Sequence, residues 1–363
     1  MLNIDVRIPT KTFDVPIYKP RLPLANEILP YLESIDKSGW YSNYGPLSRL
    51  LESRLAQRIE MKSDNVVTVV NATLALQGAI ATAANNQAWN CPSWTFAATA
   101  HAVLGAGKNL QFLDISEDWR LDPRDPRSNS TNFVDVLPFG DDVNLERFPD
   151  WADNVIVDAA GSFDSIKSLD LGSRFPVGIV ISFHPTKALA GGEGALFISN
   201  DPDWVSRLRQ WANFGFDQNR VAIQTGTNAK MSEYACAVTL ASFDKWESDR
   251  KQWVELQNWA VATSAEFNLG IHPAMKKGYV SPYWIVEGLP TRIQGLKTSM
   301  NVGGVQTRQW WESGCHKMPA FKNYANGDFF RTEAISERTL GLPFFRGISE
   351  DQKLKIIEAM KKS

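Results

Sequence analysis

The chain has 363 residues, 44% of them hydrophobic, which is enough apolar material for a sizeable core divided between two domains. Its 38 Lys and Arg residues nearly balance 40 Asp and Glu residues without a long run of one sign, so the composition argues against nucleic acid as a partner. Three cysteines and four histidines are too few and too scattered for a disulfide framework or a zinc site, so no metal is expected and a reducing cytoplasm fits best.

Two segments near the start of the chain bear on a membrane location. The amino terminus, Met1-Leu2-Asn3-Ile4-Asp5, lacks the basic start and apolar core of a signal peptide. Residues 65–107 contain no Asp, Glu, Lys or Arg, but polar residues recur and Trp89-Asn90-Cys91-Pro92 interrupts the stretch. No apolar run therefore reaches the ~20 residues that a membrane span needs, and no membrane partner is expected.

Apolar runs alternate with helical patterns from about residue 45 to 245, which is typical of an α/β fold with a mostly parallel sheet between helices. We expect seven strands, of which six are predicted at residues 66–70, 110–113, 133–137, 155–158, 177–182 and, as an antiparallel return, 195–198. Helices are predicted at 73–84 with Asn71 as its cap, at 94–104, and from 229 to about 246 with Met231, Tyr234, Ala235 and Val238 on one face.

The pattern changes beyond about residue 247, where a helix to about 267 is followed by strand-like pieces at 279–286 and loops rich in Trp and Gly. This predicts a large α/β domain over residues 1–246, including an N-terminal arm of about residues 1–20, and a smaller α+β domain over 247–363. The chain ends in a short amphipathic helix in which Ser349 and Gln352 have capping-box spacing. Leu354, Ile357 and Met360 are expected to face inward.

Lys187 and Asp158 carry the predicted chemistry. Lys187 lies in a turn of small residues just beyond the strand at 177–182, and Asp158 ends the strand at 155–158. Because parallel strands end at one edge of a sheet, where open α/β folds build their sites, both side chains are expected to face one site. Enzymes that use pyridoxal 5′-phosphate (PLP) need this pair, a lysine for the Schiff base and an acidic partner for the pyridinium nitrogen.

A site for the phosphate of this cofactor is predicted at Asn71-Ala72-Thr73, where a strand passes into a helix of small residues. Free backbone N–H groups and the helix dipole favour an anion there, and Thr73 adds a hydroxyl. Ser182, just before the lysine turn, offers a second hydroxyl. Taken alone, Asn-x-Thr before a helix is more often a simple cap, so the prediction depends on Lys187 and Asp158.

Aromatic residues are candidates for the walls around the cofactor ring. An aromatic in Pro92-Ser93-Trp94-Thr95-Phe96, expected to open a helix, can stack on one face of the ring, while the small Ala160 leaves room on the other. The alternative is that Trp94 and Phe96 are ordinary core residues. Trp310 and Trp311 either pack between the domains or flank the mouth of the site, and the sequence leaves both possibilities open.

Several motifs occur in a fixed order and together carry a resemblance. They are Gly45-Pro46-Leu47, Asn71-Ala72-Thr73-Leu74-Ala75-Leu76, Pro92 to Ala100, Asp158-Ala159-Ala160, Ser182-Phe183-His184-Pro185-Thr186-Lys187 with Gly192-Glu193-Gly194, Asn228 to Glu233, Cys315 to Phe321, and Leu340-Gly341-Leu342-Pro343. In this order they resemble the DegT/StrS family of fold-type I PLP-dependent sugar aminotransferases, over about residue 20 to the end of the chain.

The resemblance implies a role for each matching residue at the cofactor. Lys187 would be the catalytic lysine that bonds to the cofactor and moves protons, and Asp158 would keep the pyridine nitrogen protonated. Phe96 would stack on the ring, opposite the space left by Ala160. The phosphate would be bound by Ala72, Thr73 and Ser182.

The resemblance also bears on the subunit contact and the sugar. Asn228 would reach the phosphate in a partner subunit, which implies a homodimer with shared active sites. His316 would lie near the sugar. Gly161 departs from the Gln or His that the family has for the cofactor's phenolic oxygen, so that Ser162 or water would substitute. Lys230 stands where Arg is common, which implies a looser contact between subunits.

The implied activity is transfer of an amino group, with L-glutamate as donor, to a nucleotide-linked keto-deoxysugar, with PLP alternating with pyridoxamine 5′-phosphate. Similarity to members that make 4-amino-4,6-dideoxy sugars lies around Arg308-Gln309-Trp310-Trp311 and Cys315-His316. It implies a dTDP-4-keto-6-deoxyhexose substrate and a role in surface polysaccharide synthesis, such as that of O-antigen.

Two alternatives use the same fold. Dehydratases that resemble this family carry histidine in place of the lysine, so Lys187 disfavours sugar dehydration. A non-catalytic nucleotide-sugar binder or regulator is the other alternative, since a fold does not dictate function, but Lys187, Asp158 and Thr73 argue against it. His184 is interpreted as a packed turn residue rather than a base.

Overall fold

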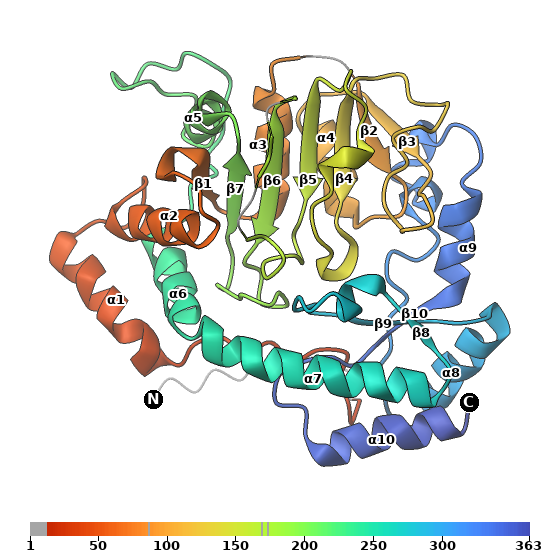
Figure 1. Cartoon of the computed structure of the whole chain (residues 1–363). Coiled ribbons are helices and arrows are strands. Elements are labelled where there is room, and N and C mark those ends of the chain that lie inside the picture. Colours follow the sequence, from red (N-terminus) through yellow and green to blue (C-terminus); the bar gives the residue numbers. More distant parts are fainter. Residues whose placement is uncertain (1–12, 86–87, 168–169, 173) are drawn as a thin grey trace.

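The computed structural model describes residues 13–85, 88–167, 170–172 and 174–363, which form a seven-stranded and a three-stranded sheet with helices around them (Figure 1). The large sheet contains β1 (Val66–Val69), β2 (Trp89–Pro92), β3 (Leu110–Leu113), β4 (Asn132–Val136), β5 (Asn154–Asp158), β6 (Val177–Ser182) and β7 (Ala195–Ser199). The small sheet contains β8 (Gly270–Ile271), β9 (Trp284–Glu287) and β10 (Thr339–Leu342). The helices are α1 (Ala25–Ser38), α2 (Pro46–Arg58), α3 (Ala72–Thr82), α4 (Ala97–Gly105), α5 (Pro202–Trp211), α6 (Glu233–Asp244), α7 (Trp246–Glu266), α8 (Pro290–Val302), α9 (Phe330–Arg338) and α10 (Glu350–Lys361).

The large sheet has the strand order β1-β7-β6-β5-β4-β2-β3. Only β7 runs antiparallel to its neighbours, β1 and β6, and the other pairings are parallel. The predicted α/β class, the seven strands and the antiparallel return after the lysine turn are thus confirmed. Because every strand except β7 runs in one direction, their carboxyl ends meet at a single edge of the sheet.

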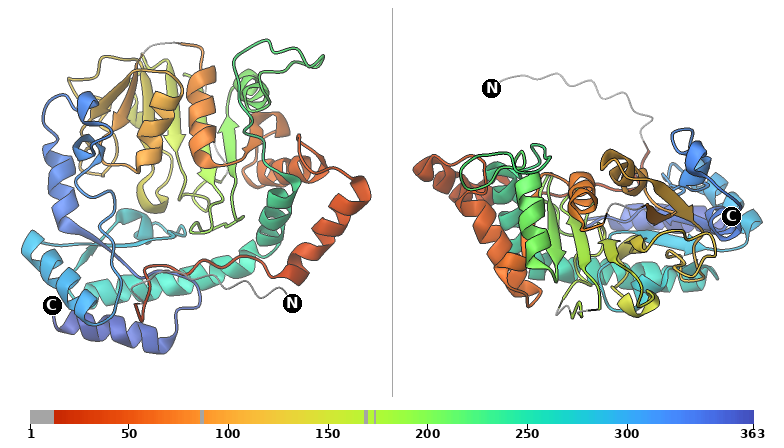
Figure 2. Two further views of the ribbon diagram at one scale, coloured as in Figure 1. Left: turned by 180° about the vertical axis from the view of Figure 1, so that it is seen from behind. Right: turned by 90° about the horizontal axis from the view of Figure 1, so that it is seen from above.

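Alternating side chains divide the core between the two faces of the large sheet. In β5, Val155 and Val157 belong to one hydrophobic cluster, and Ile156 between them belongs to another. Helices α2, α6 and α7 contribute to the first cluster and α3, α4 and α5 to the second, so helices cover both faces. The view from behind in Figure 2 shows α3, α4 and α5 in front of the sheet.

The strand β2 is the one that the sequence did not reveal. Trp89-Asn90-Cys91-Pro92 lacks the β-branched, alternating pattern of its neighbours, but all four residues are buried between β3 and β4. The predicted helix start at residue 94 was wrong, because α4 begins at Ala97. Ser93 instead extends the strand ladder by a bond from its amide to the Leu113 carbonyl, 2.9 Å away.

Two helices differ from their predicted faces or ends. The helix predicted from 229 begins at Glu233, capped by Ser232. Ala229 lies outside it because its carbonyl accepts from the Val70 amide and its amide donates to the Ala212 carbonyl. The buried side chains of this helix include Cys236 and Leu240, whereas Tyr234 is 48% exposed, so the predicted face was wrong.

In α10 the capping box of Ser349 and Gln352 is confirmed. Met360 is buried as predicted, but Leu354 is exposed. Ile356 and Ala359 complete the buried face, since residues spaced by three or four share one side of a helix.

The small sheet, α8, α9 and α10 all come from the part of the chain after residue 266, and α7 leads into them beneath the large sheet (Figure 1). The predicted domain boundary between residues 246 and 247 remains a prediction. One hydrophobic cluster contains both Leu51 of α2 and Met360 of α10, which lie on opposite sides of that boundary. Of the predicted N-terminal arm, residues 1–12 lie outside the described residues. The amide of Val15 donates to the Gly304 carbonyl, so the described part of the arm packs on the C-terminal half.

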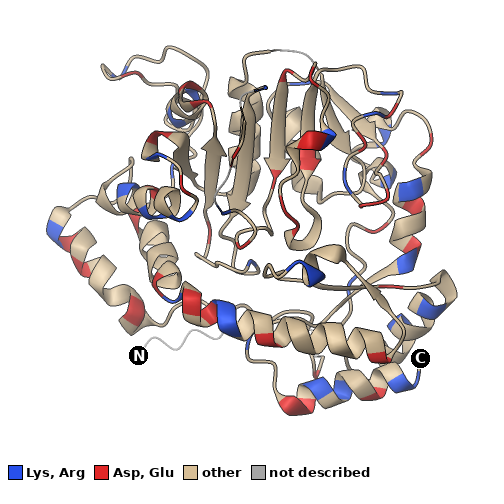
Figure 3. Ribbon diagram, in the orientation of Figure 1, with Lys and Arg blue, Asp and Glu red and all other residues tan. Residues whose placement is uncertain are grey.

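Charged residues of both signs are interspersed on the outer helices, and the strands of the large sheet carry few of them (Figure 3). The uncharged stretch 65–107 contains β1, α3, β2 and α4, which are core elements of the α/β fold. Among the described residues, no helix combines the length and the apolar character that a membrane crossing requires.

Candidate active site

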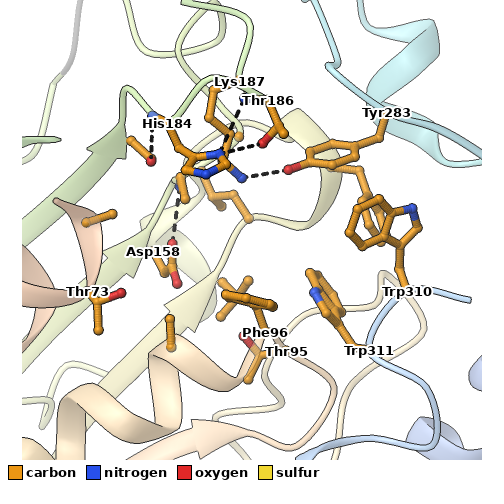
Figure 4. A pocket seen from close by; sticks show the side chains of 18 of the residues that line it. Thr73, Thr95, Phe96, Asp158, His184, Thr186, Lys187, Tyr283, Trp310 and Trp311 are labelled. Carbon is orange, nitrogen blue, oxygen red and sulfur yellow. Dashed lines mark hydrogen bonds between the residues drawn. The ribbon is translucent and has the colours of Figure 1, made fainter. Parts of the chain in front are cut away.

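A cavity of about 530 Å³ lies at the carboxyl-end edge of the large sheet. Its walls include the ends of β4, β5 and β6, the start of α3 and the segment before α4. Residues from the second half of the chain close the other side, namely Tyr283, Arg308, Trp310 and Trp311 (Figure 4). The structure brings together seven of the residues singled out from the sequence: Ala72, Thr73, Phe96, Asp158, Ala160, Ser182 and Lys187.

Lys187 stands in the turn that joins β6 to the antiparallel β7. Its amide donates to the His184 carbonyl at 2.9 Å, and the turn closes where the Phe183 amide meets the Gly194 carbonyl, also at 2.9 Å. The half-buried side chain reaches across the cavity, and its Nζ atom donates to the Tyr283 hydroxyl at 2.6 Å. The amine is thus held at a defined place on the cavity wall.

Asp158 is the last residue of β5 and is buried. The Thr99 hydroxyl donates to one carboxylate oxygen at 2.8 Å, and the Ala160 amide donates to the other at 3.2 Å. Burial raises the pKa of Asp158, against the lowering effects of these two donors and of the charge on Lys187. A cationic group in the cavity would favour the charged carboxylate.

The start of α3 forms the polar end of the cavity. The Asn71 side chain caps the helix by accepting from the Leu74 amide at 2.9 Å, which confirms the predicted cap. Ala72 and Thr73 are the first helical residues, whose amides have no acceptor inside a helix. Ser182 adds a hydroxyl at the end of β6, so this corner can bind an anion.

The aromatic candidates have different environments. Trp94 is buried, in edge contact with Trp311 at 4.8 Å between ring centroids, as the core interpretation expects. Phe96 lines the cavity and is 55% exposed, which the core interpretation does not explain. Trp310 and Trp311 both line the cavity, and Trp311 stacks on Phe139 at 4.9 Å.

His184 lines the cavity beside the lysine, and its Nδ1 atom accepts from the Thr186 amide at 3.3 Å. Burial lowers the pKa of His184, with a smaller lowering by the charge on Lys187. The imidazole is therefore neutral near pH 7, hydrogen-bonded within its own turn.

Two predicted site residues lie elsewhere in the described chain. Asn228 is exposed and accepts from Lys230 at 2.7 Å, in a separate surface depression with Phe214. His316 is buried, where Nδ1 lies 2.6 Å from the Ser93 hydroxyl and Nε2 lies 3.1 Å from Glu333. Neither residue is among those that line the cavity of this subunit.

Three residues of the site were missed from the sequence. Tyr283 precedes β9, Tyr18 belongs to the N-terminal arm, and both line the cavity. Thr99 binds Asp158 from the first turn of α4, one turn after Thr95, whose hydroxyl lies 2.9 Å from that of Thr99. The spacing of the two threonines was a usable signal, whereas nothing local to Tyr283 or Tyr18 places them at this edge.

These residues fit PLP. The buried carboxylate of Asp158, which a cation would stabilise, matches the cofactor's pyridine nitrogen. The amine of Lys187 matches its aldehyde, and the start of α3, which can bind an anion, matches its phosphate. A seven-stranded, mostly parallel sheet with this site at its carboxyl edge defines the class: fold-type I PLP-dependent aminotransferases.

Comparison with known proteins gives the family. The DegT/DnrJ/EryC1/StrS aminotransferase family matches residues 23–361, and the chain belongs to it. The dTDP-4-amino-4,6-dideoxy-D-glucose transaminase of Escherichia coli is 30% identical over 368 residues, covering 95% of this chain and 98% of the relative.

Two solved structures extend the likeness. A putative PLP-dependent aminotransferase from Bacillus cereus has a TM-score of 0.83 and 28% identity, over 96% of this chain and 99% of that one. DesI, solved in the presence of its TDP-sugar product, has a TM-score of 0.80 and 27% identity, over 97% of this chain and 93% of that one. The protein is thus an aminotransferase that uses PLP.

Proposed function

We propose that the protein transfers an amino group from L-glutamate to the keto carbon of a nucleotide-linked deoxysugar. The substrate proposed is a dTDP-4-keto-6-deoxyhexose, and the product is the 4-amino sugar, used for surface polysaccharide such as O-antigen. The observation that carries the proposal is the pairing of Lys187 and Asp158 on one cavity. The activity of the Escherichia coli relative, a dTDP-4-amino-4,6-dideoxy-D-glucose transaminase, and the TDP-sugar product of DesI support the substrate class.

The cofactor would be held by residues from four parts of the large sheet's edge. The amides of Ala72 and Thr73 and the Ser182 hydroxyl would bind its phosphate, and Phe96 would cover one face of its ring. Ala160 leaves the other face open. Asp158 would pair with the protonated ring nitrogen, which would remove the cost of its burial.

When bound, PLP supplies an electron sink for the carbon that loses or gains the amino group. The Nζ atom of Lys187 removes a proton from the α-carbon of the amino donor and later delivers one to the sugar carbon. Asp158 keeps its charge beside the ring nitrogen throughout. His184 accepts from the Thr186 amide within its own turn, so Lys187 is assigned as the base.

The sugar nucleotide would enter from the side of Arg308 and Trp310. The Arg308 guanidinium lies 4.5 Å from the centroid of the Trp310 ring and lines the cavity. A stacked guanidinium offers planar donors to a diphosphate or carboxylate, and an indole offers an apolar face to a sugar ring. His316, which contacts Ser93 and Glu333, does not line the cavity and would act only through its neighbours.

A cytoplasmic homodimer is part of the proposal. The exposed Asn228, away from the cavity of its own subunit, is free to reach the phosphate corner of a second copy. Lys230 holds it by a hydrogen bond. Sedimentation velocity should give a dimer, and a monomer would contradict shared sites.

The test is an assay with purified protein, PLP, L-glutamate and dTDP-4-keto-6-deoxyglucose. We expect 2-oxoglutarate and an aminated sugar nucleotide in equal amounts, identified by mass spectrometry. Borohydride should fix the cofactor on the peptide that contains Lys187, and Lys187→Ala should abolish both signals. Lys62→Ala, at an exposed lysine outside the cavity, is the matched control.

Loss of the keto sugar without glutamate would contradict transamination and favour the dehydratase alternative. Tight binding of the sugar nucleotide with no turnover would favour a binder or regulator.

A further inference from the structure

Tyr283 joins two features of the site that lie far apart in the sequence. Its hydroxyl accepts from the Lys187 Nζ atom at 2.6 Å, and the amine lies 5.3 Å from the centroid of the tyrosine ring. The same ring lies against Gly161, three residues after Asp158. Figure 4 shows the tyrosine reaching toward the lysine from the opposite wall.

The position of the Tyr283 ring is fixed by its neighbours. Phe139 and Trp310 meet it edge-on, at 5.6 Å and 5.2 Å between centroids. The amide of Tyr283 donates to the Ser281 hydroxyl at 3.1 Å, and that hydroxyl donates to the Phe139 carbonyl at 2.5 Å. A ring held on three sides places its hydroxyl with little loss of side-chain entropy when it binds the amine.

Gly161 makes room for this arrangement. A β-carbon at residue 161 would lie 3.2 Å from the Cε2 atom of Tyr283, closer than ordinary van der Waals contact. A side chain at this position therefore requires the tyrosine ring to shift by a few tenths of an ångström. The Gln or His expected here from the family resemblance would start from the same close contact, which glycine avoids.

We propose that Tyr283 is a positioning residue that holds the Lys187 amine whenever the lysine is not bonded to the cofactor, and that Gly161 is the space that admits it. The inference rests on the proposed role of Lys187. Without the tyrosine hydroxyl, the free Lys187 side chain can adopt several rotamers. With the hydroxyl present, a hydrogen bond holds its amine at one position on the cavity wall.

This arrangement has a thermodynamic consequence that distinguishes it from simple packing. The hydrogen bond to Tyr283 exists in the cofactor-free protein and in its complex with pyridoxamine 5′-phosphate, because the lysine is free in both. It is lost when Lys187 bonds to PLP. Removing the hydroxyl should therefore tighten PLP binding about three- to tenfold, the range for one hydrogen bond, and leave the affinity for pyridoxamine 5′-phosphate unchanged.

The experiment measures equilibrium binding of PLP and of pyridoxamine 5′-phosphate to cofactor-free wild type and Tyr283→Phe. Tighter PLP binding with unchanged pyridoxamine 5′-phosphate binding is expected. Equal weakening of both would mean that Tyr283 only packs or contacts the cofactor itself, and it would overturn the proposal. Unchanged affinity for both would overturn it as well.

Two further variants separate the parts of the proposal. Gly161→Ala should shift PLP affinity in the same direction by a smaller factor, and adding it to Tyr283→Phe should change nothing more, because both act on one hydroxyl. Tyr31→Phe is the matched control, since it removes a hydroxyl that donates to Asp244 at 2.7 Å outside the cavity. Full additivity of the Gly161 and Tyr283 changes would contradict the shared mechanism.

Borohydride labelling of the wild type keeps this inference distinct from the proposed function. If the label is absent from Lys187, the proposed role of the lysine fails. If the label is present but Tyr283→Phe shows no change in the ratio of the two affinities, only the inference fails.

Discussion

The two sides of the cavity are built on different principles. The sheet edge, which carries Asp158, Ser182 and Lys187, comes from neighbouring strands whose ends coincide because the strands are parallel. The aromatic wall, defined here as Phe139, Tyr283, Trp310 and Trp311, comes from three separate segments, two of which lie beyond residue 280. Under the proposed function, the edge would supply the reacting groups, and the wall would hold the Lys187 amine and face the sugar nucleotide.

The two sides also differ in backbone strain. Phe139 and Trp311 have φ values of 56° and 58°, in the left-handed region that aromatic residues rarely adopt. The strands that carry the sheet edge contain no residue in this region among those described. Strain of this kind persists where surrounding contacts enforce it, so the wall depends on long-range packing to a degree that the edge does not.

The largest expected effect is at the sheet edge. Lys187→Ala should lower glutamate-dependent amination about 10⁴-fold, because it removes both the bond to the cofactor and the base. The measurement is steady-state turnover with matched protein concentrations. Thermal unfolding of the cofactor-free variant should stay close to wild type. Residual turnover within tenfold of wild type would contradict the central role of the lysine.

The next effect concerns stability behind the aromatic wall. Burial lowers the pKa of His272 to about 3, where its ring contacts Trp119 and Phe139. In the unfolded chain the His272 imidazole has a pKa near 6.5 and is protonated below that pH, whereas in the folded protein it stays neutral. The free energy of unfolding therefore falls as pH drops from about 6.5 toward 3. The loss attributable to this residue is about 4 kcal/mol.

His272→Asn tests this by removing the titration while keeping an acceptor for the Ala274 amide. Denaturant unfolding at a series of pH values should give a shallower decline for the variant below pH 6.5. Parallel curves for the two proteins would show that His272 does not contribute to the acid sensitivity.

Asp158→Asn should lower turnover about 100-fold, since a neutral amide no longer favours the protonated ring nitrogen. Burial already raises the pKa of Asp158, so the cofactor-free variant should keep its stability within about 1 kcal/mol. Assay and unfolding are measured on the same preparation. A large loss of stability with unchanged turnover would reverse the assignment of Asp158 from chemistry to structure.

The smallest effect is at the rim of the wall. A β-carbon at Gly341 would lie 2.3 Å from the Trp310 Nε1 atom, so Gly341→Ala must displace the indole. We expect the KM for the sugar nucleotide to rise about tenfold with little change in kcat, as for a lost binding contact. Gly295→Ala, in α8 with nothing within 4 Å of the new methyl group, is the control. A fall in kcat alone would instead place Trp310 at the chemical step.

The sequence determined most of the sheet edge. Short runs rich in β-branched residues predict parallel strands, and they end at or just before Thr73, Asp158 and Lys187. Parallel strands bring their carboxyl ends to one edge of the sheet, whatever the conformation of the loops. The cap at Asn71 and the capping box at Ser349 were equally predictable, because they depend on residues within one turn of a helix.

Only the tertiary structure decided the aromatic wall and what fills the space at Gly161. Tyr283 lies 96 residues from Lys187 along the chain, and no local pattern connects it to either the lysine or Gly161. The same holds for the strand β2 and for Leu354. Contacts with distant parts of the chain bury Trp89–Pro92 and leave Leu354 exposed, in both cases against the local sequence pattern. Contacts between loops of different origin depend on packing, which is a property of the folded chain and cannot be read from residue spacing.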